Sequence, residues 1–223
     1  MRGLFVTGTD TGVGKTEVAT ALVAGWRARG LDVGAMKPAQ SGVEDGLATD
    51  ADRLREAAGG TDPAGLVCPY SFRAPLAPAV AARLEGVHVS LAHVLACAAE
   101  LTRRHAALVV EGAGGLLVPL TDRETYADLA VALGMPVLLV ARAGLGTVNH
   151  TALTCEALRT RGLVVAGVIL NRAVPGLDPS EPHNVSAIER LTGARVLASL
   201  PHEPDPGLRS RLLPDRLAGA VQF

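Results

Sequence analysis

The sequence predicts an α/β protein with a mostly parallel, doubly wound sheet that carries helices on both faces. Short apolar runs alternate along the chain with segments whose apolar residues recur at helical spacing, which is typical of parallel strands joined by crossover helices. Aromatic residues make up only 3% of the 223 residues whereas 48% are hydrophobic, so Leu, Val and Ala must form a core of the kind a fully buried parallel sheet has. Because no break in composition, low-complexity tract or repeat divides the chain, we expect one domain over residues 1–223.

The first predicted strand, at residues 4–6, leads into a glycine-rich loop and then a helix over residues 15–29. The residues that define the loop are Gly8, Gly12, Gly14, Lys15 and Thr16. Glycines let backbone N–H groups crowd around a polyphosphate, the helix N-terminus and the lysine add positive charge, and the threonine hydroxyl suits Mg2+. The loop therefore predicts a P-loop NTPase with a Rossmann-like three-layer fold, the alternative being a turn that only joins strand to helix.

Two strand ends place charged residues beside this loop. Lys37 follows the predicted strand 33–36, and Glu111 follows the predicted strand 107–110. Because open α/β sheets bind ligands at the carboxyl ends of their strands, both side chains are expected at the ligand edge. An acid at such a strand end serves Mg2+ or its water shell in P-loop proteins. A solvated lysine and a glutamate that caps a turn are the alternatives.

The rest of the chain continues the alternation. Further strands are predicted at 136–141, 164–170 and 195–200, and further helices at 79–84, 90–105, 125–133, 147–161 and 184–192, besides a short helix around Leu54. Residues 40–42 read as a polar loop. The segment 61–89 is rich in proline and glycine, so we expect it to wrap the substrate end of the site.

Composition narrows the possible partners and the compartment. A net charge of −1 provides no basic field for nucleic acid or an acidic membrane, and the N-terminus shows neither a signal peptide nor a membrane span. The three cysteines lack metal spacing and read as buried free thiols in a reducing cytosol, so a cytoplasmic protein is expected. The six histidines form no ligand cluster, and Ser41 lacks the neighbours of a catalytic nucleophile.

Four strings taken together resemble the ATP-dependent dethiobiotin synthetase family. They are Gly-Thr-Asp-Thr-Gly-Val-Gly-Lys-Thr at 8–16, Met-Lys-Pro-Ala-Gln-Ser-Gly at 36–42, Val-Glu-Gly-Ala-Gly-Gly at 110–115 and Leu-Gly-Thr-Val-Asn-His-Thr at 145–151. The resemblance extends from residue 4 to about residue 203. It implies a Mg2+- and ATP-dependent cyclo-ligase of biotin biosynthesis that forms C–N bonds. Such an enzyme converts 7,8-diaminononanoate and CO2 to dethiobiotin, with ADP and phosphate, through a carbamate and a carbamic-phosphoric anhydride.

The same resemblance implies roles for individual residues. Lys15 and Lys37 would be catalytic, and Ser41 would contact the diamine substrate. The metal ligands would be Thr16, Asp50 and Glu111, with Asp50 preferred over Asp52 because Thr49-Asp50-Ala51 fits the family string better. The nucleotide would be held by Thr11, Gly12, Val13, Gly14, Lys15, Thr16, Glu17, Asp50, Glu111, Gly112, Ala113, Gly114, Asn171, Arg172, Pro201, His202 and Glu203. The family works as a homodimer, so Gly146, Thr147 and Asn149 would reach the substrate carboxylate across the interface.

Two other functions remain as alternatives. A partitioning or cell-division type ATPase switch shares a loop that departs from G-x-x-x-x-G-K-S/T, as this one does with five residues between Gly8 and Gly14. Such switches carry an early lysine in Lys-Gly-Gly-x-Gly-Lys-Thr, however, and Asp10 stands there in this chain. A cobyrinate-type amidotransferase would need an added glutaminase domain with a catalytic cysteine, for which the chain has no room.

Overall fold

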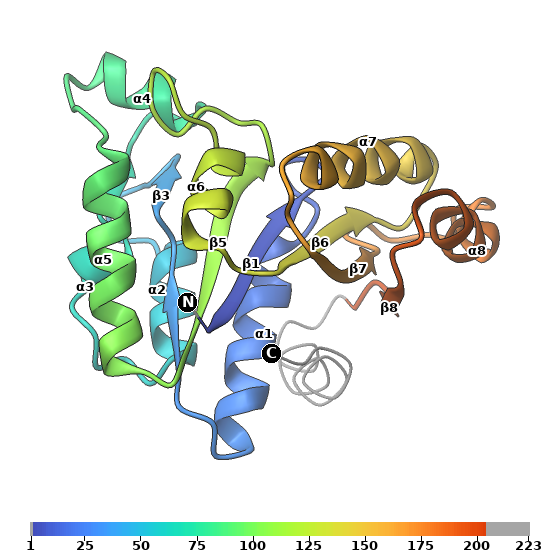
Figure 1. The fold of residues 1–223 in the computed structure, drawn as a ribbon, viewed down its shortest axis with the longest axis horizontal. Coiled ribbons are helices and arrows are strands. Elements are labelled where there is room, and N and C mark those ends of the chain that lie inside the picture. Colours follow the sequence, from blue (N-terminus) through green and yellow to red (C-terminus); the bar gives the residue numbers. More distant parts are fainter. Residues whose placement is uncertain (1, 204–223) are drawn as a thin grey trace.

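The protein is described here by a computed structural model over residues 2–203, in which six parallel strands form the central sheet (Figure 1). In spatial order the strands are β2 (Val33–Met36), β5 (Ala107–Gly115), β1 (Gly3–Gly8), β6 (Val137–Arg142), β7 (Val165–Asn171) and β8 (Val196–Leu200). Every neighbouring pair runs parallel. From β1 the chain crosses to the edge strand β2, returns to β5 beside β1, and then adds β6, β7 and β8 on the other side of β1, so the predicted doubly wound sheet is confirmed. Strands β5 and β6 flank β1, which places the loop after β1 at the switch point of the sheet.

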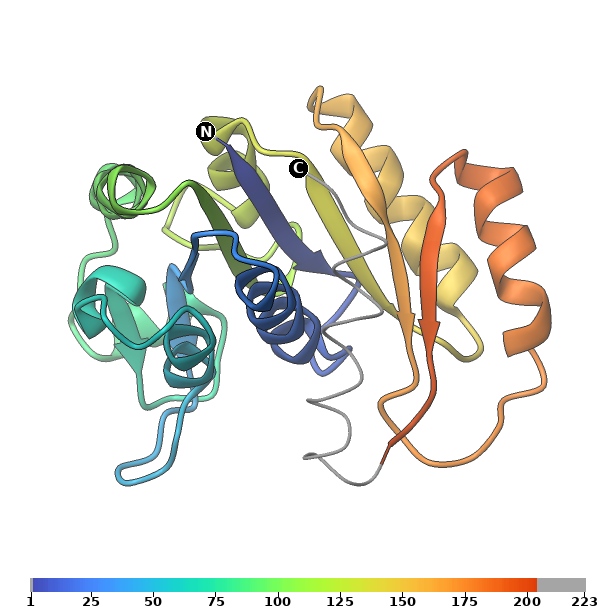
Figure 2. The same cartoon turned by 90° about the horizontal axis from the view of Figure 1, so that it is seen from below.

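Helices cover both faces of this sheet (Figure 2). On one face, α1 (Lys15–Ala28) and α2 (Asp50–Ala57) bury Val18, Leu22 and Leu54 against alternate residues of the strands. The opposite face is covered by α5 (Leu91–Arg104), α6 (Tyr126–Leu133), α7 (Thr147–Thr160) and α8 (Glu181–Thr192). The core on both faces consists mainly of Leu, Val and Ala. Strands covered by helices on both faces have no side chain that faces water, so nearly all of their residues are apolar.

Three short elements were missed by the sequence reasoning. Residues 40–42 were expected as a loop, but Ala39–Ser41 form β3, which pairs in parallel with β4 (Tyr70–Phe72) in a separate two-stranded sheet. The four-residue helix α3 (Ala64–Val67) also lies in the segment rich in proline and glycine, before α4 (Pro78–Leu84). Strands of three residues are too short to show an alternating pattern, and pairing between residues 31 positions apart leaves no local signal.

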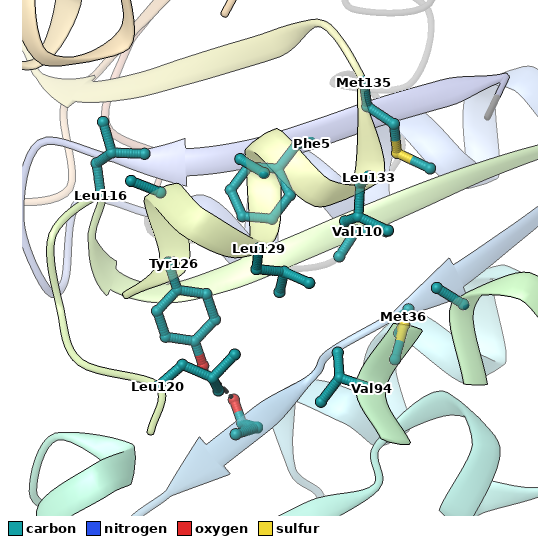
Figure 3. Close-up of a cluster of buried hydrophobic side chains, with 14 of the residues drawn as sticks. Phe5, Met36, Val94, Val110, Leu116, Leu120, Tyr126, Leu129, Leu133 and Met135 are labelled. Carbon is teal, nitrogen blue, oxygen red and sulfur yellow. Dashed lines mark hydrogen bonds between the residues drawn. The ribbon is translucent and has the colours of Figure 1, made fainter. Parts of the chain in front are cut away.

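A buried tyrosine joins the small sheet to the main core (Figure 3). Tyr126, at the start of α6, is fully buried and packs in the same cluster as Phe5 and Leu129. Its hydroxyl donates a hydrogen bond of 3.4 Å to the backbone carbonyl of Ala39 in β3. This contact ties β3, and the residues that follow Lys37, to the face of the main sheet that α6 covers.

The boundaries of two elements differ from the prediction in ways that affect the site. The fifth strand extends to Gly115, so Glu111 and the glycines after it lie within β5 and not beyond its end. Glu111 lies beside Val6 of β1, and Gly115 lies beside Gly8. Helix α8 begins at Glu181, three residues before the predicted start. Within residues 2–203, no helix is long and apolar enough to cross a membrane.

An ionic cluster around His105 closes the sheet edge opposite the phosphate loop. The imidazole is 8% exposed, and its Nδ1 and Nε2 lie 2.8 Å and 2.7 Å from carboxylate oxygens of Asp32 and Asp62. Arg27 and Arg104 approach the same two carboxylates at 3.5 Å and 3.6 Å. Burial alone would lower the pKa of His105, but the hydrogen bonds to both carboxylates outweigh it and raise the pKa. Two carboxylate partners require both ring nitrogens to donate, so the ring is an imidazolium.

This cluster predicts a loss of stability at high pH. Since the pKa of folded His105 lies above the unfolded value of about 6.5, its contacts stabilise the fold fully below about pH 6.5. They are lost as the pH rises through the raised pKa, which should lower the free energy of unfolding by about 1 kcal/mol. Urea unfolding at several pH values should show this loss in the wild type and in His88→Gln, an exposed histidine. The same pH dependence in His105→Gln would contradict the assignment.

Candidate active site

The phosphate loop is held in a conformation that only some residues can adopt. Gly14 caps α1 with φ 93° and ψ 27°, in the left-handed region that favours glycine. The Asn171 side chain, fully buried at the end of β7, donates a 2.9 Å hydrogen bond to the carbonyl of Val13. A Cβ atom on Gly14 would lie 2.1 Å from Asn171 Nδ2. The loop is therefore fixed from behind by the tip of a strand that is distant in sequence.

Lys15 lies over the loop as a buried cation. Its side chain is 7% exposed, and its ammonium donates to the carbonyl of Asp10 at 2.8 Å. Burial, opposed in part by Glu111, lowers the pKa of Lys15 to about 8. The carboxylate of Asp10, which stands where a switch ATPase carries its early lysine, is paired with Arg142 at the end of β6 at 2.7 Å. An anion bound in the loop would offset the burial of Lys15 and keep it charged.

A second buried cation, Lys37, is held between two carboxylates. Its Nζ lies 2.5 Å from Glu111 Oε1 and 3.0 Å from Asp50 Oδ2, and its side chain is 3% exposed. Burial alone would lower the pKa of Lys37, but Glu111 and Asp50 outweigh burial and raise it. The Thr16 hydroxyl donates to the same Glu111 oxygen at 2.7 Å. One carboxylate thus joins the start of α1 to the end of β2, and the solvated-lysine alternative is wrong.

These groups line one pocket of about 800 Å3. The sequence-derived candidates on its wall are Thr11, Gly12, Gly14, Lys15, Thr16, Glu17, Lys37, Ser41, Asp50, Glu111, Ala113 and Gly114. Val13 and Gly112 lie behind this wall and are not part of the lining. Residues 75–78 of the segment rich in proline and glycine also line this pocket, as does Ser41. The pocket therefore combines the residues of the phosphate loop with a second group of lining residues, Ser41 and residues 75–78.

Other candidates lie elsewhere in the single chain. Arg172 bonds Glu181 of α8 through Nε at 2.9 Å, and residues 201–203 follow β8. Gly146, Thr147 and Asn149 are at the start of α7, where Thr147 is buried and Asn149 is exposed. Within residues 2–203, none of these is among the residues that line the 800 Å3 pocket.

Several lining residues carry a role that sequence reasoning did not assign, and Gln40 is the most informative. It is 8% exposed, its Oε1 accepts from the backbone N–H of Ala51 at 3.1 Å, and its Nε2 donates to Ser71 Oγ at 3.0 Å. It therefore holds the first turn of α2, which begins at Asp50. Its place between Lys37 and Ser41 was the only signal in the sequence.

We expect Gln40→Ala to raise the Mg2+ concentration needed for half-maximal activity about fivefold, because Asp50 loses its support, at a cost of about 1 kcal/mol for one hydrogen bond. A Mg2+ titration of the steady-state rate measures this. Ser71→Ala removes the other hydrogen bond of the same side chain and should leave the titration near that of the wild type. A normal titration in Gln40→Ala would remove Gln40 from this role.

The oxygen-rich wall fits a hard divalent cation that shares its ligands with phosphate. Glu111 Oε2 is buried and has no hydrogen-bond partner among the described residues. Two carboxylates and a threonine hydroxyl are ligands that Mg2+ accepts, together with phosphate oxygens and water. No group of three or more His, Cys, Asp or Glu side chains within residues 2–203 is arranged to hold a metal by itself. A metal here would take its remaining ligands from water and from phosphate oxygens.

Comparison with known proteins gives a family. The family model described as AAA domain matches residues 2–207. The ATP-dependent dethiobiotin synthetase BioD of Anaeromyxobacter dehalogenans strain 2CP-C is 66% identical over 223 residues, which is all of both chains. The protein of the same name from Bacillus velezensis is 42% identical over 204 residues, covering 90% of this chain and 87% of its own.

Two solved structures share the fold. The ParA family ATPase from Chlorobium tepidum TLS has a TM-score of 0.58 at 13% identity, with 99% of this chain and 97% of that chain covered. The MinC:MinD cell division protein complex from Aquifex aeolicus has a TM-score of 0.59 at 14% identity, with 99% and 92% covered. At such identities the likeness shows the P-loop fold alone and carries no support for a switch function.

Proposed function

The chain belongs to the ATP-dependent dethiobiotin synthetase family, and from that premise we propose how its pocket closes the ring of dethiobiotin in biotin biosynthesis. The observation that supports this function most strongly is the 66% identity to the Anaeromyxobacter dehalogenans protein, in an alignment that covers the full length of both chains. The protein is accordingly an ATP-dependent ligase that acts on small molecules. The charged groups that line the pocket support a role for each of them in that reaction.

In the proposed mechanism, one amine of 7,8-diaminononanoate captures CO2 as a carbamate. The γ-phosphoryl group of ATP passes to the carbamate oxygen to give a carbamic-phosphoric anhydride. The second amine then displaces phosphate, and the ring closes. Carbamate and triphosphate are both anions, so bringing them together requires cations that are already in place. No side chain has to carry a covalent intermediate.

Each charged residue of the pocket has a proposed role in this sequence. Lys15 and the N–H groups of the loop bind the β- and γ-phosphates, and Lys37 neutralises the carbamate and the transferred group. Thr16, Asp50 and Glu111 would hold Mg2+, which supplies charge neutralisation between the phosphates. Ser41, beside the wall formed by residues 75–78, would contact the diamine.

Adenine recognition is proposed for the strand tips and the loop after β8. Asn171 ends β7 and Arg172 follows it, and residues 201–203 follow β8, the next strand in the sheet. Asn171 already bonds the phosphate loop, so one residue would link purine recognition to the position of the loop. Residues 112–114 of β5 would complete the nucleotide side.

A homodimer is proposed because Gly146, Thr147 and Asn149 lie outside the lining of their own chain's pocket. Leu145 and Leu153 beside them are 78% and 57% exposed, which suits a surface that a second copy covers. We also propose one domain over residues 1–223 and a cytoplasmic location, which the free state of Cys68, Cys97 and Cys155 favours. A net charge of −1 supports the absence of nucleic acid and membrane partners.

The function is tested by following ADP and dethiobiotin in the presence of diaminononanoate, bicarbonate, Mg2+ and ATP. We expect formation of ADP to require both the diamine and bicarbonate, and to stop when EDTA removes the metal. Replacing ATP with each other nucleoside triphosphate in turn measures the purine preference. If ADP formed at the same rate with and without the diamine, the proposed ligase activity would be contradicted and the protein would act only as a triphosphatase.

A further inference from the structure

Two of the three side chains proposed as Mg2+ ligands contact an ammonium group in this structure, and the third is hydrogen-bonded to one of those two. Lys37 Nζ lies 2.5 Å from Glu111 Oε1 and 3.0 Å from Asp50 Oδ2. The Thr16 hydroxyl donates to the same Glu111 oxygen. The ammonium of Lys37 therefore occupies the position among these oxygens that a divalent cation would take.

The two cations cannot share this position. Glu111 Oε1 already accepts hydrogen bonds from Lys37 and Thr16, which uses both of its lone pairs. A metal bound to that oxygen must displace one of the two donors, and a metal bound to Oε2, which has no partner among the described residues, would lie beside the ammonium on the same carboxylate. Since Lys37 and Glu111 are 3% and 0% exposed, water would screen the repulsion between Mg2+ and the ammonium poorly. The ammonium is the donor that the metal would drive away.

The pocket offers the displaced ammonium of Lys37 a second position. Lys37 lines the same pocket as Lys15 and Ser41, so a shift of its flexible side chain keeps its charge inside the pocket. There it would face the γ-phosphate and the carbamate without a carboxylate partner. The ion pairs with Lys37 balance the charge of two carboxylates, one of which is fully buried.

We propose that Lys37 acts as a stand-in for Mg2+ in the nucleotide-free protein, and that arrival of the metal with ATP displaces its ammonium into the pocket. This inference rests on the proposed function, because it uses the metal ligands assigned there. It makes the catalytic lysine available only after Mg2+ and ATP have bound. The carbamate would therefore meet an available Lys37 only in the loaded enzyme.

The test is the affinity for Mn2+ in the absence of nucleotide, measured by the electron paramagnetic resonance signal of free Mn2+. Lys37→Met keeps the length of the side chain and removes its charge, so it should bind Mn2+ at least tenfold more tightly than the wild type. Lys37→Arg retains the cation and should bind as weakly as the wild type. Lys15→Met removes a charge that contacts the Asp10 carbonyl and no carboxylate, so its effect should be smaller.

Equal Mn2+ affinity of Lys37→Met and the wild type without nucleotide would overturn the inference. If both proteins nevertheless bound Mn2+ with ADP present, the proposed metal site would still be supported. Failure of every variant to bind Mn2+ even with ADP would overturn the metal site as well. Crystals of the wild type with a non-hydrolysable ATP analogue, with and without Mg2+, give a second test that needs no variant. Lys37 Nζ should leave hydrogen-bonding distance of Glu111 Oε1 only when the metal is present, and an unmoved ammonium would refute the displacement.

Discussion

Replacing Lys37 with alanine should lower the rate of dethiobiotin formation about 100- to 1000-fold, the size of effect seen when one preorganised group that stabilises transition-state charge is lost. Binding of ATP should largely persist, because Lys15 and the loop N–H groups that bind the phosphates remain in place. Steady-state kinetics and displacement of a fluorescent ATP analogue measure the two quantities separately. Turnover at the wild-type rate would remove Lys37 from catalysis.

Lys15→Ala provides the matched contrast. Both lysines are buried and line the same pocket, but Lys15 lies on the phosphate loop whereas Lys37 contacts the carboxylates. Lys15→Ala should therefore weaken ATP binding more than Lys37→Ala does. The same loss of ATP affinity in both variants would contradict the division of labour between binding and chemistry.

Gly14→Ala should weaken ATP binding about 100-fold, which corresponds to about 2.7 kcal/mol. A left-handed backbone costs an alanine about 1–2 kcal/mol, and the new Cβ would lie 2.1 Å from Asn171 Nδ2. Asn171 would have to move and give up its buried hydrogen bond to the Val13 carbonyl, which adds about 1–3 kcal/mol. Calorimetric titration with ATP and thermal unfolding of the free protein measure the two costs.

Gly12→Ala isolates the contact from the backbone strain. Gly12 also has a positive φ, 72°, but a Cβ there meets no atom within 4 Å. This variant should therefore lose only the strain energy, so its ATP affinity should fall less than that of Gly14→Ala. If Gly14→Ala and Gly12→Ala bound ATP equally well, Asn171 would have no part in shaping the loop.

The strands and helices of the main sheet were predictable because each carries its own pattern. The continuous apolar run at residues 33–36 indicates a strand that is buried on both faces. The helical spacing of apolar residues after Lys15 indicates a helix that is buried on one face. The strand β3 was not predictable, since three residues carry no period and its partner β4 lies 31 positions away. Its stability comes from tertiary contacts such as the Tyr126 hydroxyl on Ala39, which local sequence does not encode.

The site divides in the same way. Lys15 and Thr16 follow from the loop motif, and Lys37 and Glu111 follow from strand ends that meet at one sheet edge. Asp50 came only from the family resemblance, because several carboxylates of the segment 43–60 are equally close in sequence. The structure brings Asp50 to Lys37 and leaves Asp52 bonded to Thr49 as part of a helix cap. Gln40 could not be predicted because its role depends on the backbone N–H of Ala51 and the hydroxyl of Ser71, which come from two other segments.

The two-stranded sheet of β3 and β4 is separate from the six strands that support the phosphate loop. It carries Gln40 and Ser41, and residues 75–78 follow its second strand as part of the same wall. Substitutions or insertions in this wall can reshape the space for an acceptor molecule without shifting the cradle for the nucleotide. Divergence toward other acceptors would then be concentrated in this small module, while the half of the fold that delivers chemical energy stays constant.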